Sequence, residues 1–120
     1  MMENTKYEIE ANKTIPNVNQ YKEIEFSLKD KKIINACLGL SGEVGELVDI
    51  FKKFYFQGHS LNELEIKKEL GDIFWYLNLI CQSMDTSFSE VFDLNIEKLR
   101  KRYGEKFDSQ KSVNREEYQN

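Results

Sequence analysis

The sequence is poor in residues that break helices and in residues that bind soft metals. Its 120 residues include one proline, six glycines, two cysteines and one histidine. An all-β protein of this length needs many glycine and proline turns, so the composition favours long helices. The longest uncharged run, residues 73–84, is much shorter than the ~20 apolar residues that span a bilayer. We therefore expect a soluble, cytoplasmic, all-α protein, with Cys37 and Cys81 as buried free thiols.

Acidic residues outnumber basic ones, 21 to 17, which gives a net charge of −4 at pH 7. This balance offers no general attraction for nucleic acid or for an anionic membrane, so neither is expected as a partner. An anionic ligand would need a metal ion or a local basic cluster. With 40% hydrophobic and 32% charged residues, the chain is expected to fold as one domain that can also self-associate.

Apolar residues at helical spacing mark three long segments, and each segment predicts a helix. Ser60 with Glu63, and Ser87 with Glu90, match the capping-box pattern at the start of the second and third segments. The three helices are expected at about 33–57, 60–84 and 87–104.

A weaker helical pattern covers residues 20–28, and the charged run 29–32 interrupts it. Residues 1–18 show no sustained period and are expected to form a flexible N-terminal arm. Residues 105–120 are expected to form a polar C-terminal tail, which leaves 19–104 as the folded domain. With about four helices and short connections, the simplest architecture is a small antiparallel helix bundle.

Two pairs of carboxylates border the apolar stripes of the first two long helices. On helical wheels Glu43 and Glu46 lie at the margin of one stripe, and Glu69 and Asp72 lie at the margin of the other. Carboxylates drawn toward a core cost several kcal/mol unless something neutralises them, and a cation is the obvious remedy. Oxygen ligands suit Mg²⁺ or Mn²⁺, whereas a single histidine disfavours zinc or di-iron. The alternative for either pair alone is a solvated helix face.

The last predicted helix supplies Asn95, Lys98 and Arg102 along the margin of its stripe. Beside a carboxylate-bound cation, these groups would make a site for a metal-chelated di- or triphosphate. The alternative is that the two basic residues only offset the helix dipole near its C-terminus. No nucleophile, base and acid occur in a suitable arrangement, so covalent catalysis is not expected.

Aromatic residues cluster in the first two long helices and are expected mainly in the core. Within this cluster Trp75 and Tyr76 are also suited to stacking on a base. His59 lies in the predicted hairpin, where it is either a loop residue or a ligand contact. Four glycines lie inside helical patterns, where each costs about 1 kcal/mol relative to alanine, which indicates close packing or room for a ligand. These glycines are Gly39, Gly42, Gly45 and Gly71.

Three ordered blocks carry a resemblance to a known family. They are GLSGEVGEL at 39–47, KELGDIFWYL at 68–77, and NIEKL with the following Arg-Tyr at 95–103. Together they resemble the MazG-like all-α nucleoside triphosphate pyrophosphohydrolases from about residue 20 to residue 115. The likeness extends to Gly58-His59 and to the tail at 112–115.

The resemblance implies hydrolysis of a (d)NTP between the α and β phosphates, which yields a nucleoside monophosphate and pyrophosphate and requires Mg²⁺, with Mn²⁺ as an alternative. The family's acidic motifs carry over to Glu43, Glu46, Glu69 and Asp72 as metal-binding and catalytic residues. The first acid of the fuller motif is replaced here by Gly42.

The same resemblance implies a substrate-binding set and an assembly. Lys98 and Arg102 would hold the β and γ phosphates, and Asn95 would orient a phosphate or the sugar. The family forms dimers or tetramers with sites near subunit contacts, so a homodimer or homotetramer is expected, and the arm and tail could close a neighbour's site. The remaining substrate-binding candidates are Trp75, Tyr76 and His59.

Two groups of alternatives remain open at this point. One lies within the superfamily, as a dUTP- or dCTP-specific enzyme or a phosphoribosyl-ATP pyrophosphohydrolase. The other is a noncatalytic helical oligomer that binds nucleotide or protein, or a purely structural bundle.

Overall fold

Every regular element in the computed structural model is a helix, among the residues that the structure describes (3–104, 106 and 109–114). The prediction of an all-α protein is therefore confirmed. No helix in this part of the chain is long and apolar enough to cross a bilayer. The elements are α1 (Lys6–Asn12), α2 (Val18–Lys22), α3 (Leu28–Phe56), α4 (Glu63–Ser83), α5 (Phe88–Tyr103) and α6 (Ser109–Val113).

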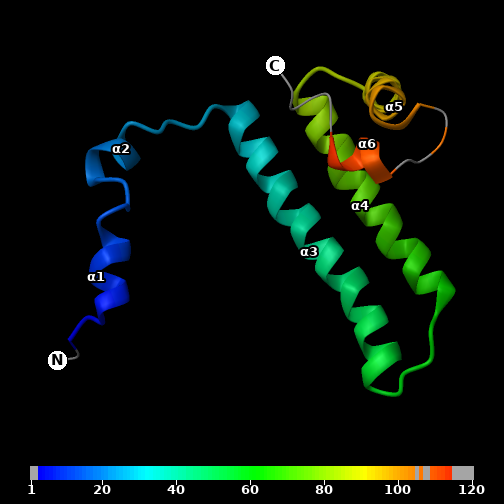
Figure 1. Ribbon diagram of the computed structural model, residues 1–120, viewed down its shortest axis with the longest axis horizontal. Coiled ribbons are helices and arrows are strands. Elements are labelled where there is room, and N and C mark those ends of the chain that lie inside the picture. Colours follow the sequence, from blue (N-terminus) through cyan, green and yellow to red (C-terminus); the bar gives the residue numbers. More distant parts are fainter. Residues whose placement is uncertain (1–2, 105, 107–108, 115–120) are drawn as a thin grey trace.

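Helices α3 and α4 form a long antiparallel hairpin, which holds the main tertiary contact of the chain (Figure 1). Their facing surfaces are apolar because side chains three and four residues apart share one face of a helix. Ala36 of α3 and Cys81 of α4 are buried, and the other inner residues are partly buried. These are Ile33, Leu40, Leu47 and Ile50 on α3, and Ile66, Ile73, Leu77 and Ile80 on α4.

The first long helix begins five residues earlier than predicted, at Leu28. Ser27 is its N-cap: the Ser27 hydroxyl accepts from the Asp30 N–H at 3.1 Å, and the Asp30 carboxylate accepts from the Ser27 N–H at 2.9 Å. The charged run 29–32 is therefore the first turn of α3, and the prediction that it interrupts the pattern was wrong. A carboxylate in this turn also favours the helix dipole. Of the predicted helix at 20–28, residues 20–22 belong to α2, which begins at Val18, and Leu28 is the first residue of α3.

The second helix of the hairpin is capped by Asn62, so the predicted capping box of Ser60 and Glu63 was wrong. The Asn62 side-chain oxygen accepts from the N–H groups of Leu64 and Glu65 at 3.1 and 3.2 Å. An asparagine immediately before the helix satisfies the same orphan donors that Ser60 was expected to satisfy.

Ser87 caps α5 as predicted, and it accepts from the Glu90 N–H at 3.2 Å. The carboxylate of Glu90 accepts instead from the Thr86 hydroxyl at 2.6 Å, so the capping box is incomplete. Gly104 ends the helix with a φ of +69°, a conformation that glycine adopts without strain.

The N-terminal arm is more regular than its sequence pattern predicts. Thr5 with Glu8 forms a complete capping box at the start of α1, and Asn17 with Gln20 does so for α2. These two short helices lie apart from the α3–α4 hairpin (Figure 1). In the predicted tail α6 is the helix described, while residues 105, 107, 108 and 115–120 lie outside the described residues, as does Arg115 of the resemblance.

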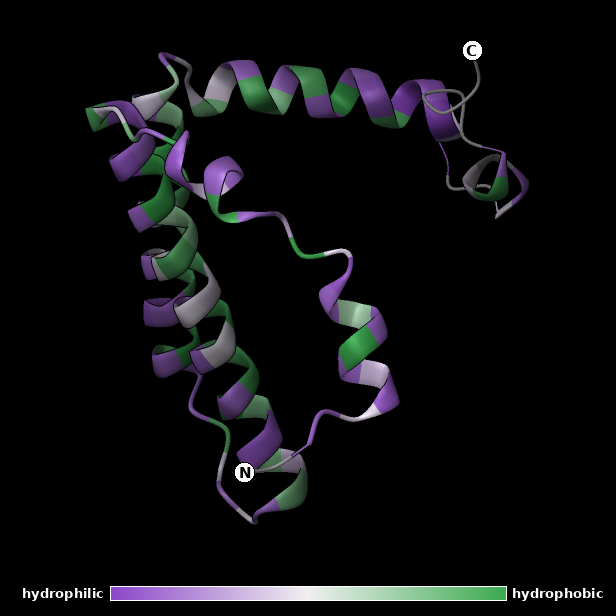
Figure 2. Cartoon of the chain, turned by 90° about the vertical axis from the view of Figure 1, so that its left-hand side faces the viewer, coloured by the Kyte–Doolittle hydropathy of each residue, from purple (hydrophilic) through white to green (hydrophobic). Residues whose placement is uncertain are grey.

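Much apolar surface lies outside the hairpin contact, because two helices share only one pair of faces. The expectation that the aromatic cluster forms the core was wrong: Trp75 is 59% exposed and Phe56 is 84% exposed. Cys37 is exposed as well, contrary to prediction. Helix α5 runs away from the hairpin (Figure 2), and its connection to α4 includes an edge contact between Phe74 and Phe88 with ring centroids 6.4 Å apart.

Gly39 accounts for one close approach inside the hairpin. A Cβ built on Gly39 would overlap the ring of Tyr76, whereas a Cβ on Gly42, Gly45 or Gly71 would meet nothing within 4 Å. Close packing therefore explains Gly39, and open space surrounds the other three.

We expect Gly39→Ala to lower the free energy of unfolding by about 1–3 kcal/mol, because the Tyr76 ring must move to make room. Gly42→Ala is the matched control, and it should be neutral or stabilising by up to about 1 kcal/mol, because alanine favours the helix. Urea unfolding followed by circular dichroism measures both values. Equal stability of the two variants would contradict the packing role of Gly39.

Candidate functional site

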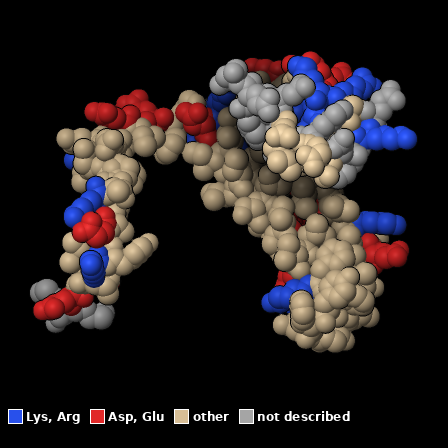
Figure 3. Space-filling view, viewed as in Figure 1, with Lys and Arg blue, Asp and Glu red and all other residues tan. Residues whose placement is uncertain are grey.

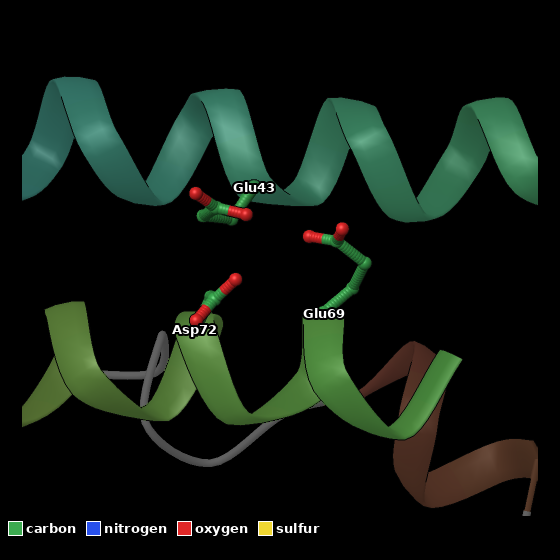
Figure 4. Close-up of side chains that lie close together, drawn as sticks. All are labelled: Glu43, Glu69 and Asp72. Atoms are coloured by element: carbon green, nitrogen blue, oxygen red, sulfur yellow. The ribbon is translucent and has the colours of Figure 1, made fainter. Parts of the chain in front are cut away.

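Three carboxylates meet in the middle of the hairpin's apolar seam. Glu43 extends from α3 toward Glu69 and Asp72 of α4, as Figure 4 shows, and one carboxylate oxygen of each lies within 4.8 Å of the others. The two residues of α4 share a face because they are three positions apart. The antiparallel packing of the helices sets Glu43 opposite them.

This carboxylate cluster is partly withdrawn from water. Glu43 and Glu69 are half-buried and Asp72 is exposed. The Oε2 atoms of Glu43 and Glu69 are buried and accept no hydrogen bond from the residues that the structure describes. Buried carboxylate oxygens without donors are costly, so the cluster is energetically incomplete as a protein-only arrangement.

Contacts among the acids raise the pKa of two of them, Glu69 and Glu46. In its protonated form Glu69 can donate a hydrogen bond to Glu43, and this, followed by desolvation, raises the pKa of Glu69 above the usual range. Glu46 lies one turn further along α3 and is exposed. Protonated Glu46 can donate to Glu69 in the same way, and this, followed by like-charge repulsion from Glu69, raises the pKa of Glu46. All four predicted acids therefore interact with one another.

The donor set fits a hard divalent cation. It consists of carboxylate oxygens from both helices, and two of these oxygens are buried with no hydrogen-bond donor among the described residues. Glu43, Glu69 and Asp72 are the residues that could hold such an ion together. A cation would also offset the repulsion that raises the pKa of Glu69 and Glu46.

Two hollows flank the carboxylate cluster. The first, which we call the aromatic hollow, has a volume of about 370 Å³ and is lined by Glu43, Asp72, Trp75 and Tyr76. The rings of Trp75 and Tyr76 meet edge to face with centroids 5.0 Å apart. The structure thus brings these two predicted substrate-binding residues next to the acids.

The second hollow, which we call the hairpin hollow, has a volume of about 280 Å³ and lies toward the α3–α4 turn. It contains His59, a predicted substrate-binding residue, together with residues that the sequence analysis did not single out. The pairing of Asp49 with Lys53 at i, i+4 spacing was a usable signal, but such pairs are common on solvated helices. The lining residues are Glu46, Asp49, Ile50, Lys53, His59, Ser60, Glu65 and Glu69.

Asn95, Lys98 and Arg102 all lie on α5, and none of them lines either hollow. Figure 3 shows lysine and arginine side chains gathered over this helix. Arg102 lies over the ring of Tyr103, with its Cζ 5.9 Å from the ring centroid. Within one chain these residues are thus not next to the acids, and their contact with phosphate stays a prediction.

Fold and site together define an all-α protein with a carboxylate centre suited to a divalent cation on a helical hairpin. The sequence profile of the MazG nucleotide pyrophosphohydrolase domain matches residues 32–107, more than half of the chain. The chain therefore belongs to this family, and the resemblance seen in the sequence is confirmed. Its match covers the hairpin and α5 but not the arm with α1 and α2.

The chain is also similar to the Gene 37 protein of Mycobacterium phage L5. The two are 32% identical over an alignment of 69 positions, and the match covers 54% of this chain and 60% of the phage protein. The chain thus spans less than two thirds of the length of this relative. No solved structure matches the chain.

We expect Mg²⁺ or Mn²⁺ to raise the melting temperature of EDTA-treated protein at pH 7.5. At a concentration of 100 times the Kd, a cation that binds only the folded state stabilises it by about 2.7 kcal/mol. The increase should shrink toward pH 5, because the raised pKa of Glu69 and Glu46 lets protons compete with the ion at a higher pH than for ordinary glutamates.

Differential scanning calorimetry of Glu69→Gln, with Glu97→Gln of α5 as control, tests the assignment. The control carries the same change on an exposed residue outside the cluster and should respond to the cation as the unmodified protein does. An equal response of both variants would exclude the carboxylate cluster as the cation site.

Proposed function

We propose that the protein is a divalent-cation-dependent nucleoside triphosphate pyrophosphohydrolase. It cleaves a (d)NTP between the α and β phosphates and releases the nucleoside monophosphate and pyrophosphate, with Mg²⁺ as the physiological ion and Mn²⁺ as a substitute. The observation that carries this proposal is the convergence of Glu43, Glu69 and Asp72 on the hairpin of a MazG-family domain, where two of their oxygens have no donor among the described residues.

In this proposal the acids have different tasks. Glu43, Glu69 and Asp72 hold the cation, and Glu46 either completes the ligand set or accepts the proton of the attacking water. Its raised pKa and its exposed position beside Glu69 favour the second role. The bound cation supplies charge neutralisation at the phosphate oxygens and lowers the pKa of water.

Gly42 stands where the fuller family motif has another acid. It is exposed in α3, and a side chain there would meet nothing within 4 Å. The proposed chemistry uses four acids. It involves no covalent enzyme intermediate, because neither cysteine is among the residues that line the aromatic hollow or the hairpin hollow in the described part of the chain.

Lys98 and Arg102, with Asn95, are proposed to bind the β and γ phosphates in an assembled protein. Helix α5 runs away from the hairpin of its own chain (Figure 2), so in an assembly these residues would reach the acids of a second copy. Trp75, Tyr76 and His59 complete the proposed substrate-binding set, from the two hollows beside the cluster.

The surface of the single chain supports a homodimer or homotetramer. Its accessible area is 10541 Å², against roughly 6,800 Å² for a compact protein of this mass. Its radius of gyration is 20.8 Å, against roughly 14 Å for a compact domain of this length. The excess is about 3,700 Å² per chain, so two copies that covered it fully would bury about 7,500 Å² in total, which lies at or above the upper end of the range for obligate homodimers. An exposed second stripe on α3 (Cys37, Val44, Val48, Phe51 and Tyr55) is the apolar face that a second copy would cover.

We expect the purified protein to convert at least one NTP or dNTP with Mg²⁺ to monophosphate and pyrophosphate, and EDTA to abolish the reaction. Asp72→Asn and Glu43→Gln should fold normally, lose the cation-induced rise in melting temperature and lose activity. Glu46→Gln should keep that rise and lose about 100-fold or more in kcat, because it removes the proton acceptor. Product chromatography with each common nucleotide measures the reaction, and Asp93→Asn on α5 is the control.

Near-normal turnover by Asp72→Asn would contradict the cation assignment. Cation binding and nucleotide binding without turnover of any nucleotide would instead indicate the noncatalytic nucleotide-binding alternative. The ranking of bases in the same experiment separates a general NTP hydrolase from one specific for dUTP or dCTP.

We expect light scattering after gel filtration to give a dimer or tetramer of the 14.2 kDa chain. Val48→Asp, which places a charge on the exposed α3 stripe, should shift the mass toward the monomer, and Asp93→Asn should not. Mixed oligomers of Asp72→Asn and Arg102→Met chains should regain activity that neither has alone, if α5 of one copy serves the acids of another. A monomeric, fully active protein would overturn the assembly.

A further inference from the structure

We propose that the hairpin hollow binds the nucleobase of the substrate and that Asp49 and Lys53 determine which base is preferred. The polyphosphate then extends toward the aromatic hollow. This inference rests on the proposed function. The hollow contains Glu69 of the carboxylate cluster and the neighbouring Glu46, so a nucleotide bound at the acids can reach into it.

The walls of the hairpin hollow are held in place by the turn after α3. Gly58 has a φ of +71°, which reverses the chain direction at low cost. The N–H groups of Gln57 and His59 both donate to the carbonyl oxygen of Lys53, at 3.0 and 3.2 Å. His59 and Ser60 are thereby fixed beside the last turn of α3, opposite Glu65.

Asp49 and Lys53 present an acceptor and a donor side by side. The Lys53 Nζ lies 2.9 Å from the Asp49 Oδ2, and the two side chains remain 44% and 42% exposed. The hydrogen bond between them raises the pKa of Lys53 and lowers the pKa of Asp49, so both are charged at neutral pH. The edge of a nucleobase offers a matching pattern of amino donors and carbonyl or ring-nitrogen acceptors.

The charge of the hairpin hollow disfavours the polyphosphate. Four carboxylates line it against one ammonium group. Even with Glu46 and Glu69 engaged by a cation, two carboxylates face the single lysine, and a triphosphate would be repelled. An uncharged base suffers no such repulsion and can use both the donors and the acceptors.

The aromatic hollow has no carboxylate other than those of the cation cluster. Apart from Glu43 and Asp72, which belong to the cation cluster, its lining is Trp75 and Tyr76. The indole N–H and the phenol O–H can donate to phosphate oxygens. Stacking of the base on Trp75 would send the polyphosphate into the acidic hairpin hollow, so the charge distribution favours the reverse orientation.

The test compares dCTP with dUTP, which are similar in size. At the edge of the base, dCTP carries an amine where dUTP carries a carbonyl. Calorimetry with their α,β-imido analogues and Mg²⁺ gives the ratio of the two dissociation constants in each variant. Changes that affect both nucleotides equally cancel in this ratio. Pyrophosphate release from the natural nucleotides is measured separately, so failure of the proposed catalysis and failure of this inference are distinguishable.

We expect Asp49→Asn to weaken dCTP-analogue binding relative to the dUTP analogue by about tenfold, because it removes a charged acceptor for the amine. Lys53→Met should shift the ratio in the opposite direction, because it removes a donor to the carbonyl. Asp93→Asn is the control and should leave the ratio unchanged.

An unchanged ratio in both variants overturns the inference, as does failure of the unmodified protein to bind either analogue. If Trp75→Leu shifted the ratio and neither Asp49→Asn nor Lys53→Met did, the base would bind in the aromatic hollow, and the inference would be wrong. Equal weakening of both analogues and of inorganic triphosphate by Lys53→Met would make Lys53 a phosphate ligand and would also overturn the inference.

Discussion

The rest of the structure depends on one constraint: the apolar seam between α3 and α4 has carboxylates in its middle. Apolar residues on both sides of Glu43, Glu69 and Asp72 hold the helices together and thereby hold the acids within 4.8 Å of one another. The seam supplies the energy that offsets like-charge repulsion, and a divalent cation would remove that repulsion. Hydrophobic packing and ion binding are therefore coupled in one element.

The two ends of the carboxylate cluster are chemically different. Toward the turn, the hairpin hollow combines carboxylates, an ammonium group and a hydroxyl, while the other side presents aromatic rings. Such asymmetry would give the proposed nucleotide substrate one orientation, because its charged and uncharged ends have different electrostatic requirements. Asp49 and Lys53 matter in this view because their ion pair arranges a donor and an acceptor before any ligand arrives.

The single chain is open and leaves much apolar surface exposed, which bears on the proposed oligomer. Only Ala36 and Cys81 are buried among the residues that the structure describes, and α5 carries an apolar face with little to pack on. A helical hairpin has too little shared surface to bury two stripes per helix. In the proposed oligomer the basic residues of α5 and the acids of the hairpin would form one site only across an interface between copies, so the proposed catalysis would depend on assembly.

The sequence by itself determined the three long helices and the four acids on the margins of two of them, because both follow from a period of 3.6 residues that is visible locally. Caps were less predictable: Asn62 and Ser27 begin helices where Ser60 and the region near Ile33 were expected, since several nearby polar residues can satisfy the same N–H groups. Only the tertiary structure decided that Glu43 faces Glu69 and Asp72, that Tyr76 lies against Gly39, and that the aromatic residues stay exposed. The hairpin hollow, with Lys53 beside His59, also exists only through the fold. Helix α3 has two apolar stripes, and the way α3 and α4 pack decides which stripe faces α4. The periodicity of one helix cannot predict this.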